Sequence, residues 1–238
     1  AGKDDQPGEL KVGCTTERGR QARDRCDKIM RSTYSSAEPC VSVRDRINQR
    51  KNLWYCESIN ATNPCGEQPL PPYGACLLGS VNLAALVMHP FEETAAIDIP
   101  ALDALVATAV RMLDDAIDVS NFPLPQQLHE AKAKRRIGLG VTGLADALIM
   151  CGLRYGSAAA VQLTESWLKA IERTAYLASA ALAAEKGSFP LYDREKYLAA
   201  EMVKGLDQDV RDAIAQHGMR NGLLTSIAPT GTISLFAD

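Results

Sequence analysis

Long hydrophobic runs are absent from this 238-residue sequence. A helix that spans a bilayer needs about 18 consecutive apolar residues, and no run approaches that length. The N-terminus also lacks the apolar core of a secretory signal, so a cytoplasmic location is the expectation that follows. A large charge of either sign is absent as well. The net charge of −3 gives no electrostatic reason to expect nucleic acid or a membrane surface as a partner.

Zinc-like patterns are missing too. The chain has seven cysteines and three histidines, but it has no CxxC pair, and no histidine lies near a cysteine at zinc-ligand spacing. We therefore predict no metal site. An odd number of cysteines is unlike the closed framework of a disulfide-rich secreted protein, and thiols stay free in a reducing compartment. The cysteines are then either small buried residues or reactive thiols.

A stretch rich in proline and glycine, Asn60–Leu83, holds two of these cysteines and a glutamate. Its prolines exclude a continuous helix, and its glycines permit tight backbone turns. Cys65 lies two residues from Glu67, a spacing that puts a thiol and a general base on one side of an extended segment. A turn after Glu67 would bring Cys76 back beside Cys65, as in redox exchange between thiols. The alternative is that both cysteines are buried as small hydrophobic residues.

Helical periodicity dominates the rest of the chain. Apolar residues at helical spacing predict a helix from Pro100 to about Asn121, and a long one from the N-cap Ser157 to Lys186 with Gly187 as C-cap. The shorter predicted elements are helices from Asp27 to just before Pro39, at Asp193–Lys204 and at Asp207–His217, and strands at Val41–Val43, Leu53–Cys56 and Gly222–Ala228. Trp54 and Tyr55 are expected in the core. Strands separated by helices indicate an α/β fold.

The glycine run at residues 138–143, GLGVTG, has the spacing GxGxxG. In a dinucleotide-binding fold this motif follows a clear strand and precedes an acidic strand end. Neither is convincing in this sequence. We therefore interpret the three glycines as positions where backbone packs closely against backbone.

A second polar motif, PTGTIS at Pro229–Ser234, follows the last predicted strand and opens a helix. Free backbone N–H groups and hydroxyls at such a position suit a phosphate. The motif lacks the GK[ST] ending of a Walker loop. The alternative is that its threonines and serine only cap the following helix.

Three motifs in this order carry a resemblance to a known family: NPCGEQPLPPYGACLLGSVNL, RRIGLGVTGLADAL and APTGTIS. They resemble the catalytic subunit of ribonucleotide reductase, and most of all its adenosylcobalamin-dependent class, class II. DKIMRSTYSSAEP and DRINQRKNLWYCE fit the same family, so the resemblance covers residues 27–238. The nearest alternative is the large subunit of a class I reductase, which takes its radical from a separate metal-containing subunit. Another alternative is a non-catalytic nucleotide-binding remnant.

The resemblance implies a ten-stranded α/β barrel with a finger loop, about residues 60–76, through its centre. Residues 27–238 would be a helix-rich part of this catalytic domain, truncated at both ends, after a divergent or poorly ordered lead-in at residues 1–26. The implied cofactor is adenosylcobalamin, and no residue of this chain is assigned to holding it. The implied partners are a ribonucleoside di- or triphosphate, a thioredoxin- or glutaredoxin-type reductant, and a second copy in a homodimer.

The matching positions also imply roles in reducing ribonucleotides to deoxyribonucleotides for DNA synthesis. Cys65 would be the transient thiyl radical that takes the 3′ hydrogen of the ribose. Glu67 would remove the 3′ hydroxyl proton, and Asn63 would hydrogen-bond the ribose hydroxyls. Cys76 would belong to the cysteine pair that supplies the reducing equivalents and ends as a disulfide. The substrate phosphates would rest on Pro229, Thr230, Gly231, Thr232, Ile233 and Ser234.

Departures from the family pattern precede the finger loop. Cys40 stands where glycine is expected, and Ser42 and Arg44 stand where apolar residues are expected. Two polar residues would sit awkwardly in a strand inside a barrel. The family's partner for Cys76 lies further upstream, and no cysteine of this chain is assigned to that role. The rest of the barrel and the family's C-terminal tail cysteines are missing as well, so we expect the isolated chain not to turn over ribonucleotides. We also expect it not to fold stably, because its sheet would be left open.

Overall fold

The structure, a computed structural model, describes residues 16–37 and 41–237 of the chain. The chain divides into two units, residues 1–43 and residues 44–238, and each is described by itself. The reactive motifs predicted from the sequence all lie in the second unit.

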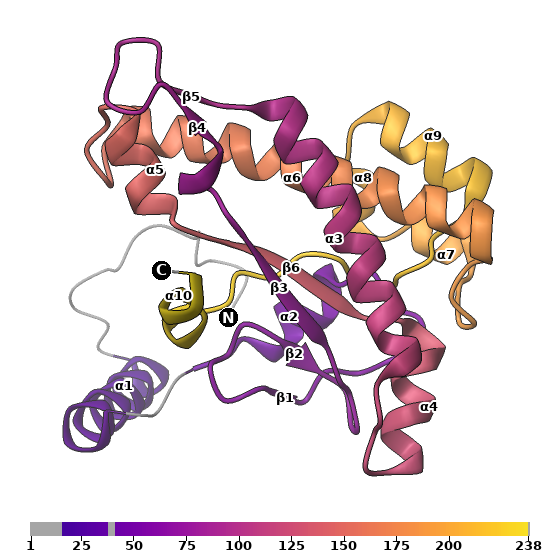
Figure 1. The fold of residues 1–238 in the computed structure, drawn as a ribbon. Helices are drawn as coiled ribbons and strands as arrows, with labels where there is room; N and C mark the ends of the chain where they lie inside the picture. The colour runs from indigo at the N-terminus through magenta and orange to yellow at the C-terminus, as the bar shows by residue number, and fades with distance from the viewer. Residues whose placement is uncertain (1–15, 38–40, 238) are drawn as a thin grey trace. The chain divides into compact units, whose positions relative to one another are not determined.

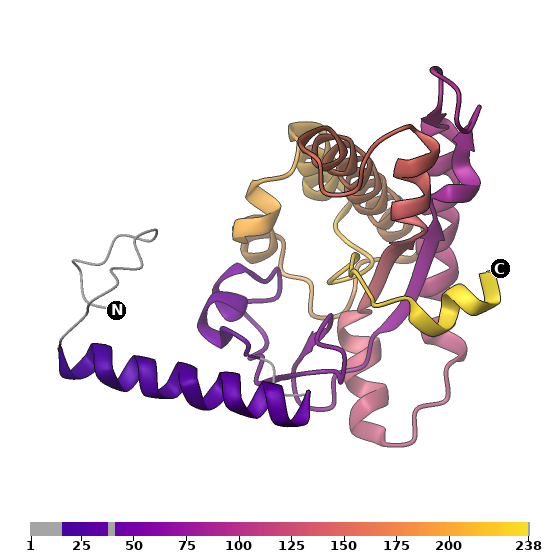
Figure 2. The ribbon, with the colours of Figure 1, turned by 90° about the vertical axis from the view of Figure 1, so that its left-hand side faces the viewer.

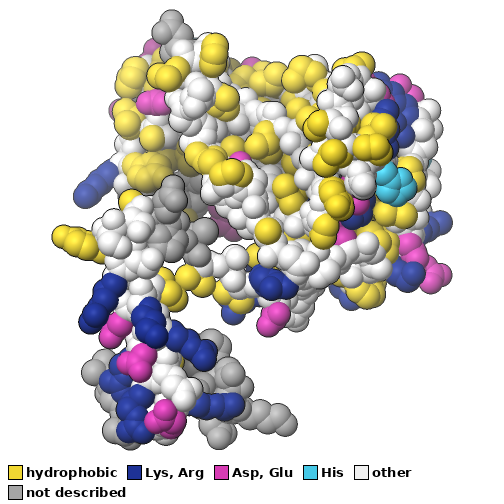
Figure 3. All heavy atoms as spheres, turned by 90° about the horizontal axis from the view of Figure 1, so that it is seen from below, with side chains coloured by type: hydrophobic (Ala, Val, Ile, Leu, Met, Phe, Trp, Pro, Cys, Tyr) yellow, Lys and Arg dark blue, Asp and Glu magenta, His cyan; other side chains and the backbone are white. Residues whose placement is uncertain are grey.

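The first unit contains one described helix, α1 (Glu17–Ser36). Thr16 caps its start, because the Thr16 hydroxyl accepts a hydrogen bond from the Gly19 N–H at 3.2 Å. The helix has no buried residue and carries many charged side chains (Figure 3). The predicted start at Asp27 was wrong, since the cap at Thr16 begins the helix well before it. Of the predicted lead-in, residues 1–15 lie outside the described residues, as does Cys40.

The second unit is organised around two parallel strands, β3 (Leu77–Asn82) and β6 (Ile137–Thr142). They lie side by side, and all six residues of each strand are paired (Figure 1). The chain between them passes through two helices, α3 (Ile99–Val119) and α4 (Pro125–Lys134). A long crossover of this kind is what a parallel pair requires.

The remaining elements are short, apart from one long helix. In chain order they are α2 (Arg44–Arg50), β1 (Ala61–Thr62), β2 (Pro69–Leu70), the 3-10 helix η1 (Ala84–Leu86), β4 (Val87–Met88), β5 (Ala96–Ile97), α5 (Leu144–Met150), α6 (Ala158–Lys186), α7 (Arg194–Leu198), α8 (Glu201–Lys204), α9 (Gln208–His217) and α10 (Gly231–Ala237). β1 pairs with β2, and β4 with β5, both antiparallel. The long helix α6 packs against α3 and against α9 (Figures 1 and 2).

The core lies between α3, α6 and one face of the strand pair. The buried apolar residues of α3 are Leu102, Val106, Val110, Leu113 and Ile117. The same cluster contains Val81 of β3, Leu139 and Val141 of β6, and Trp167 and Ile171 of α6. Burying one such aliphatic side chain contributes about 1.5–3 kcal/mol, so this layer fixes the strands against the helices.

On the opposite face of the strand pair, β6 carries glycines, Gly138 and Gly140. A Cβ at Gly140 would lie 2.2 Å from the carbonyl oxygen of Ser226, and one at Gly138 would lie 2.6 Å from Nε2 of Gln68. Backbone and side chains therefore approach β6 here more closely than any larger residue would allow. The prediction that the GxGxxG run serves close packing is confirmed.

The two long predicted helices are confirmed as α3 and α6. Ser157 caps α6, because its hydroxyl accepts from the Ala160 N–H at 3.2 Å, and Gly187 follows the last turn. The predicted helix at Asp193–Lys204 is divided into α7 and α8, since Ala200 between them is extended. The predicted helix at Asp207–His217 is confirmed as α9.

Two predicted strands were wrong. Val41–Val43 is exposed and pairs with no described strand, and Leu53–Cys56 forms turns. The turn has a physical cause in Asn48, whose amide group donates to the Ile59 carbonyl at 2.9 Å and whose Oδ1 accepts from the Ile59 N–H at 2.8 Å. Trp54, expected in the core, is 46% exposed, while its neighbour Leu53 is fully buried.

The third predicted strand, Gly222–Ala228, is an extended segment that pairs with β6 through a single bridge, Leu139 to Thr225. The Leu139 N–H donates to the Leu224 carbonyl at 2.7 Å, and the Ser226 N–H donates to the Leu139 carbonyl at 3.1 Å. The prediction of an extended, partly buried segment is confirmed, but a full strand is not formed.

The fold is helix-rich and mixed α/β, as predicted. Within residues 16–37 and 41–237, the strands form three separate pairs, and a closed ten-stranded barrel is not seen. In the same residues, no helix combines the length and the apolar character needed to cross a membrane.

Candidate active site

A small hairpin carries the predicted thiol and carboxylate. Its strands are β1 and β2, and residues 63–68 form the connecting loop. The Asn63 N–H donates to the Gln68 carbonyl at 3.1 Å, and the Gly66 N–H donates to the Asn63 carbonyl at 3.1 Å. Gly66 has a φ of +85°, a conformation that favours glycine. Because Cys65 lies in this tight loop, its side chain is exposed at the tip.

Asn63 closes the loop with its side chain as well as its backbone. Its Oδ1 accepts a hydrogen bond from the Gln68 N–H at 3.0 Å. No described residue accepts a hydrogen bond from its Nδ2 group, so the donor half of the amide remains for a ligand. An N–H donor suits the role that the sequence predicts for Asn63 towards ribose hydroxyls.

Glu67 is fixed through its backbone and unpaired at its side chain. The Ser226 hydroxyl donates to the Glu67 carbonyl oxygen at 3.0 Å, which ties the hairpin to the extended segment beside β6. The Oε2 atom of Glu67 is buried and has no hydrogen-bond partner among the described residues. Leaving a buried polar atom unpaired costs about 1–3 kcal/mol, and more for a charged group. An oxygen in this state is suited to a hydroxyl group brought by a ligand.

Cys76 lies immediately before β3 and is partly buried. Its thiol points back to the Leu77 carbonyl oxygen at 3.7 Å. Burial raises the pKa of this thiol to about 12, the charge of Arg136 opposes the rise, and the charge of Glu67 adds to it. The structure therefore brings Cys76 and Glu67 within electrostatic reach of each other. Cys76 and Cys65 are both free thiols, with no disulfide between them.

The predicted phosphate motif lies at the start of α10. Thr230 has a φ of +58°, and the Ser234 N–H donates to the Thr230 carbonyl at 3.0 Å. The Ser234 hydroxyl donates to the Gly231 carbonyl at 2.7 Å, within the first turn of the helix. Only two residues, Ile227 and Ala228, lie between this motif and Ser226. The contact between Ser226 and Glu67 therefore connects the motif to the hairpin through a short stretch of backbone.

Sequence reasoning missed a buried charge cluster next to this site. The Arg136 Nη2 donates to Glu57 Oε2 at 2.7 Å, and the Lys134 Nζ lies 3.0 Å from the same oxygen. The three side chains are between 1% and 5% exposed. The signal available in the sequence is the run of basic residues immediately before β6. Gln68, the last residue of the hairpin loop and only 6% exposed, was missed as well.

Comparison with known proteins decides what this arrangement belongs to. A family model described as "Ribonucleotide reductase, barrel domain" matches residues 9–238. This chain belongs to the ribonucleotide reductase family. The predicted resemblance to the catalytic subunit is thereby confirmed, and the match to the reductase family covers nearly the whole chain.

Several curated reductases are similar to this chain. A vitamin B12-dependent ribonucleoside-diphosphate reductase of Mycobacterium tuberculosis (strain ATCC 25618 / H37Rv) is 39% identical over 212 residues, which are 89% of this chain and 27% of that protein. One with the same description from Thermoplasma acidophilum is 38% identical over 217 residues, 91% of this chain and 26% of that protein. A ribonucleoside-diphosphate reductase subunit alpha of Chlamydia pneumoniae is 30% identical over 233 residues, 87% of this chain and 22% of that protein. The chain thus spans about a quarter of the length of these reductases.

Two departures from the reductase pattern have a local explanation. Ser42 is exposed and outside any strand, and Arg44 begins α2 and donates to Asn60 Oδ1 at 2.5 Å. The expectation that both polar residues would lie awkwardly in a buried strand was wrong, because the chain is not a strand at either position.

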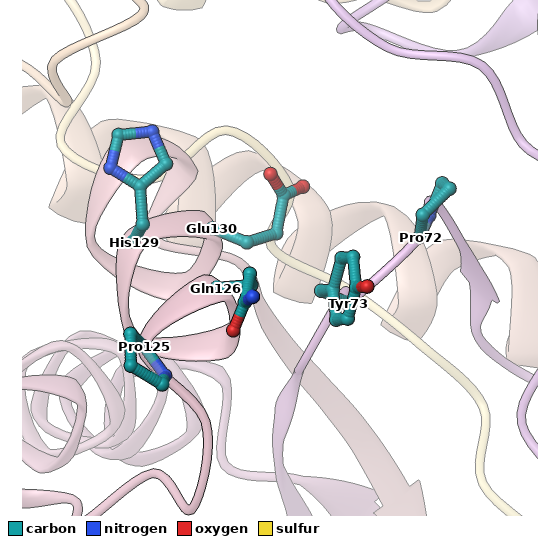
Figure 4. A pocket seen from close by; sticks show the side chains of 6 residues that line it. All are labelled: Pro72, Tyr73, Pro125, Gln126, His129 and Glu130. Atoms are coloured by element: carbon teal, nitrogen blue, oxygen red, sulfur yellow. The ribbon is translucent and has the colours of Figure 1, made fainter.

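An open cavity of about 490 Å³ lies on the surface of this reductase segment, between the loop after β2 and α4 (Figure 4). Pro72 and Tyr73 line one side, and Pro125, Gln126, His129 and Glu130 of α4 line the other. Neither Cys65 nor Glu67 lines it. Within the described part of the chain, no group of three or more histidine, cysteine or acidic side chains is placed to hold a metal ion.

Proposed function

We propose that this chain carries the reaction centre of a ribonucleotide reductase catalytic subunit. The observation that supports this most directly is the hairpin loop, where the exposed thiol of Cys65 lies two residues from the buried, unpaired Oε2 of Glu67. The thiol is accessible to an outside partner, and the carboxylate lacks a hydrogen-bond donor. Together the two groups suit a substrate that has a C–H bond next to a hydroxyl group.

The chemistry proceeds on the ribose of the substrate. The Cys65 thiyl radical takes the hydrogen from C3′, so an S–H bond forms and a C–H bond breaks. Glu67 accepts the proton of the 3′ hydroxyl, which the neighbouring radical makes more acidic. The Nδ2 group of Asn63 donates to a ribose hydroxyl and holds the ring in place.

Reduction then removes the 2′ hydroxyl. This group leaves as water, and Cys76 with a partner cysteine from outside this chain supplies two electrons and becomes a disulfide. Cys65 returns its hydrogen to C3′, which restores the thiyl radical. The balance is one C–O bond replaced by a C–H bond, one water released, and two thiols oxidised.

The substrate phosphates are assigned to Pro229–Ser234, because Ser226, which donates to the Glu67 carbonyl, lies only two residues before that motif. The substrate is a ribonucleoside diphosphate rather than a triphosphate, in keeping with the descriptions of the similar reductases. The reducing equivalents come from a thioredoxin- or glutaredoxin-type dithiol, and a second copy of the protein forms a homodimer.

Adenosylcobalamin is the proposed cofactor. Similar reductases described as vitamin B12-dependent reach 38–39% identity, whereas the subunit alpha of Chlamydia pneumoniae reaches 30%. The exposure of the Cys65 thiol fits a radical source that must reach the sulfur from outside the hairpin. When bound, this cofactor supplies the radical equivalent, and the residues of this chain provide the thiol that receives it. None of the described residues is assigned to holding the corrin ring.

The fold proposed for the complete domain is the ten-stranded barrel of the family. The described strand pair has helices on one face and the hairpin on the other, which is the arrangement expected of a section of barrel wall around a finger loop. Parts of the protein outside this chain would supply the remaining strands and the partner of Cys76.

The test is turnover of the full-length protein that contains this chain, with a ribonucleoside diphosphate and a dithiol. Glu67→Gln keeps the size of the side chain and removes the base, so the rate of deoxyribonucleotide formation should fall about 10²- to 10⁴-fold. Glu93→Gln, an exposed glutamate between β4 and β5, is the matched control and should leave the rate unchanged. A Glu67→Gln rate near that of the unaltered protein would refute the assignment.

Omitting adenosylcobalamin from the same assay distinguishes the two classes of reductase. Class II predicts that turnover stops without it, and that no second subunit is required. Turnover that needs a separate metal-containing subunit instead would favour the class I reading.

A further inference from the structure

Arg136 and Cys76 occupy neighbouring positions at the start of the parallel strand pair. The pairing of β3 with β6 sets Leu77 opposite Ile137, and Cys76 and Arg136 immediately precede those two residues. Adjacent strands lie about 4.8 Å apart, and successive side chains point to opposite faces. Cys76 and Arg136 therefore belong to the face that also carries Gly138, against which Gln68 of the hairpin packs.

A buried carboxylate holds Arg136 in this place. The 2.7 Å hydrogen bond from Arg136 to Glu57 joins side chains that are 3% and 1% exposed, and Lys134 shares the same carboxylate oxygen. Lys51 donates to the backbone carbonyl of Glu57. An arginine paired in this way does not turn outward to solvent without leaving a buried charge behind, which is strongly unfavourable.

The charges of two groups act on the Cys76 thiol: Arg136 from the start of β6 and Glu67 from the hairpin. Burial holds the pKa of the thiol at about 12, with the guanidinium lowering it and the carboxylate raising it. At pH 8 about one sulfur in ten thousand would then be a thiolate. A sulfur in this setting depends on its neighbouring cation whenever it has to carry negative charge.

We propose that Arg136, fixed by Glu57, is a positioning residue that stabilises the thiolate of Cys76 when this sulfur leaves a disulfide. The inference rests on the proposed role of Cys76 in the reducing pair. A thiolate of the external dithiol attacks the sulfur of the partner cysteine. A new S–S bond forms, the old one breaks, and the electron pair remains on the Cys76 sulfur, beside the guanidinium. That sulfur then takes a proton from solvent, and the second thiol of the dithiol closes its own disulfide and releases the partner cysteine.

The test is alkylation of the reduced full-length protein by iodoacetamide, with the rate at each cysteine followed on its own peptide by mass spectrometry. The rate reports the thiolate fraction and needs no turnover. Arg136→Gln should lower the rate at Cys76 about tenfold, which is one pKa unit. The rate at Cys151, whose thiol pKa is raised by burial alone, should not change.

A second variant should change the alkylation rate at Cys76 in the opposite direction. Glu67→Gln removes the anionic charge that acts on Cys76, so the alkylation rate there should rise. A general loosening of the structure would instead raise the rates at Cys76 and Cys151 together in both variants. Opposite changes at Cys76, with Cys151 constant, are therefore specific to the charges.

Two further variants serve as controls for the alkylation rates. Arg154→Gln, an exposed arginine in the loop between α5 and α6, should leave both cysteines unchanged. Arg136→Lys keeps the cation, so the rate at Cys76 should stay within about threefold of that of the unaltered protein, even where Arg136→Gln fails to fold. The proposal is overturned by a folded Arg136→Gln protein with an unchanged rate at Cys76, or by a tenfold loss in Arg136→Lys.

Turnover of Cys76→Ser distinguishes this inference from the function on which it rests. If that variant still reduced ribonucleotides with the dithiol, the proposed role of Cys76 would fail, and with it the assignment of Arg136 to disulfide opening. If it were inactive while Arg136→Gln left alkylation unchanged, the function would stand and only the role of Arg136 would be overturned.

Discussion

Gly140→Ala tests the contact that holds the hairpin against the strand pair. The added methyl group would lie 2.2 Å from the carbonyl oxygen of Ser226, and the next atom is the carbonyl carbon of the same residue at 3.3 Å. Both are backbone atoms, so no side chain can rotate away. The segment around Ser226 has to move off β6, and Glu67 moves with it through the hydrogen bond from the Ser226 hydroxyl.

The size of the effect follows from two contributions. Overpacking against backbone costs about 1–3 kcal/mol. Loss of the hydrogen bond from the Ser226 N–H to the Leu139 carbonyl adds about 1 kcal/mol. Gly140→Ala should therefore lower the free energy of unfolding by about 2–4 kcal/mol. Gly79→Ala is the matched control on the other strand and the other face, where the Cβ would meet Leu113 at an ordinary 3.4 Å. Its free energy of unfolding should change by less than about 1 kcal/mol.

The assay is urea unfolding of the two variants and the unaltered protein, combined with turnover. Gly140→Ala should also lose kcat, because Glu67 is displaced, while Gly79→Ala should not. Equal stability of the two variants would refute the close approach of Ser226 to β6. Lower stability of Gly140→Ala with unchanged kcat would refute the connection between that approach and the position of Glu67.

Two further predictions concern the buried network at the end of α3. Asp114 is fully buried, and it accepts a hydrogen bond from Arg135 Nε at 2.7 Å. Asp114→Ala should therefore lower the free energy of unfolding, measured by urea titration, by about 3–5 kcal/mol. Asp115 is exposed, so Asp115→Ala should lower it by less than about 1 kcal/mol. Equal losses would contradict the buried pairing. Hydrogen bonds from Arg135 hold the pKa of Asp118 in the folded protein well below its ordinary value. Asp118 therefore contributes its full stabilisation at pH values above the ordinary pKa, and this contribution is lost as the pH falls through the lower pKa of the folded state. Because Asp118 is 44% exposed, Asp118→Asn should cost less than about 1 kcal/mol at pH 7, and the cost should shrink in acid; a cost independent of pH would contradict this.

The long helices could be predicted because their information is local. The apolar spacing in α3 and the residues Ser157 and Gly187 at the two ends of α6 are readable without any tertiary contact. The same holds for the glycine run of β6, whose close packing was expected from residue size. The turn at Leu53–Cys56 could not be predicted in this way, because it depends on the side chain of Asn48 reaching Ile59, a contact eleven residues away.

For the candidate site, the sequence indicated the residue types and their order but not their state. The spacing of Cys65 and Glu67 was visible, and the structure adds that one is exposed while the other has a buried, unpaired oxygen. The contact of Ser226 with Glu67 joins residues 159 positions apart, and no local pattern encodes it. The pairing of Arg136 with Glu57 was hidden for the same reason. The roles of Cys65, Glu67, Asn63, Cys76 and Pro229–Ser234 stay predictions.

In the proposed function the hairpin thiol of Cys65 is the reacting group, and the decisive experiment is to assay turnover by Cys65→Ala. The full-length protein that contains this chain would be assayed for deoxyribonucleoside diphosphate formation beside Cys151→Ala, which removes a half-buried cysteine at the end of α5. Cys65→Ala should form no product above background, because it lacks the thiol that takes the 3′ hydrogen in the proposed reaction, while Cys151→Ala should retain the rate of the unaltered protein. Measurable turnover by Cys65→Ala would contradict the proposed reaction.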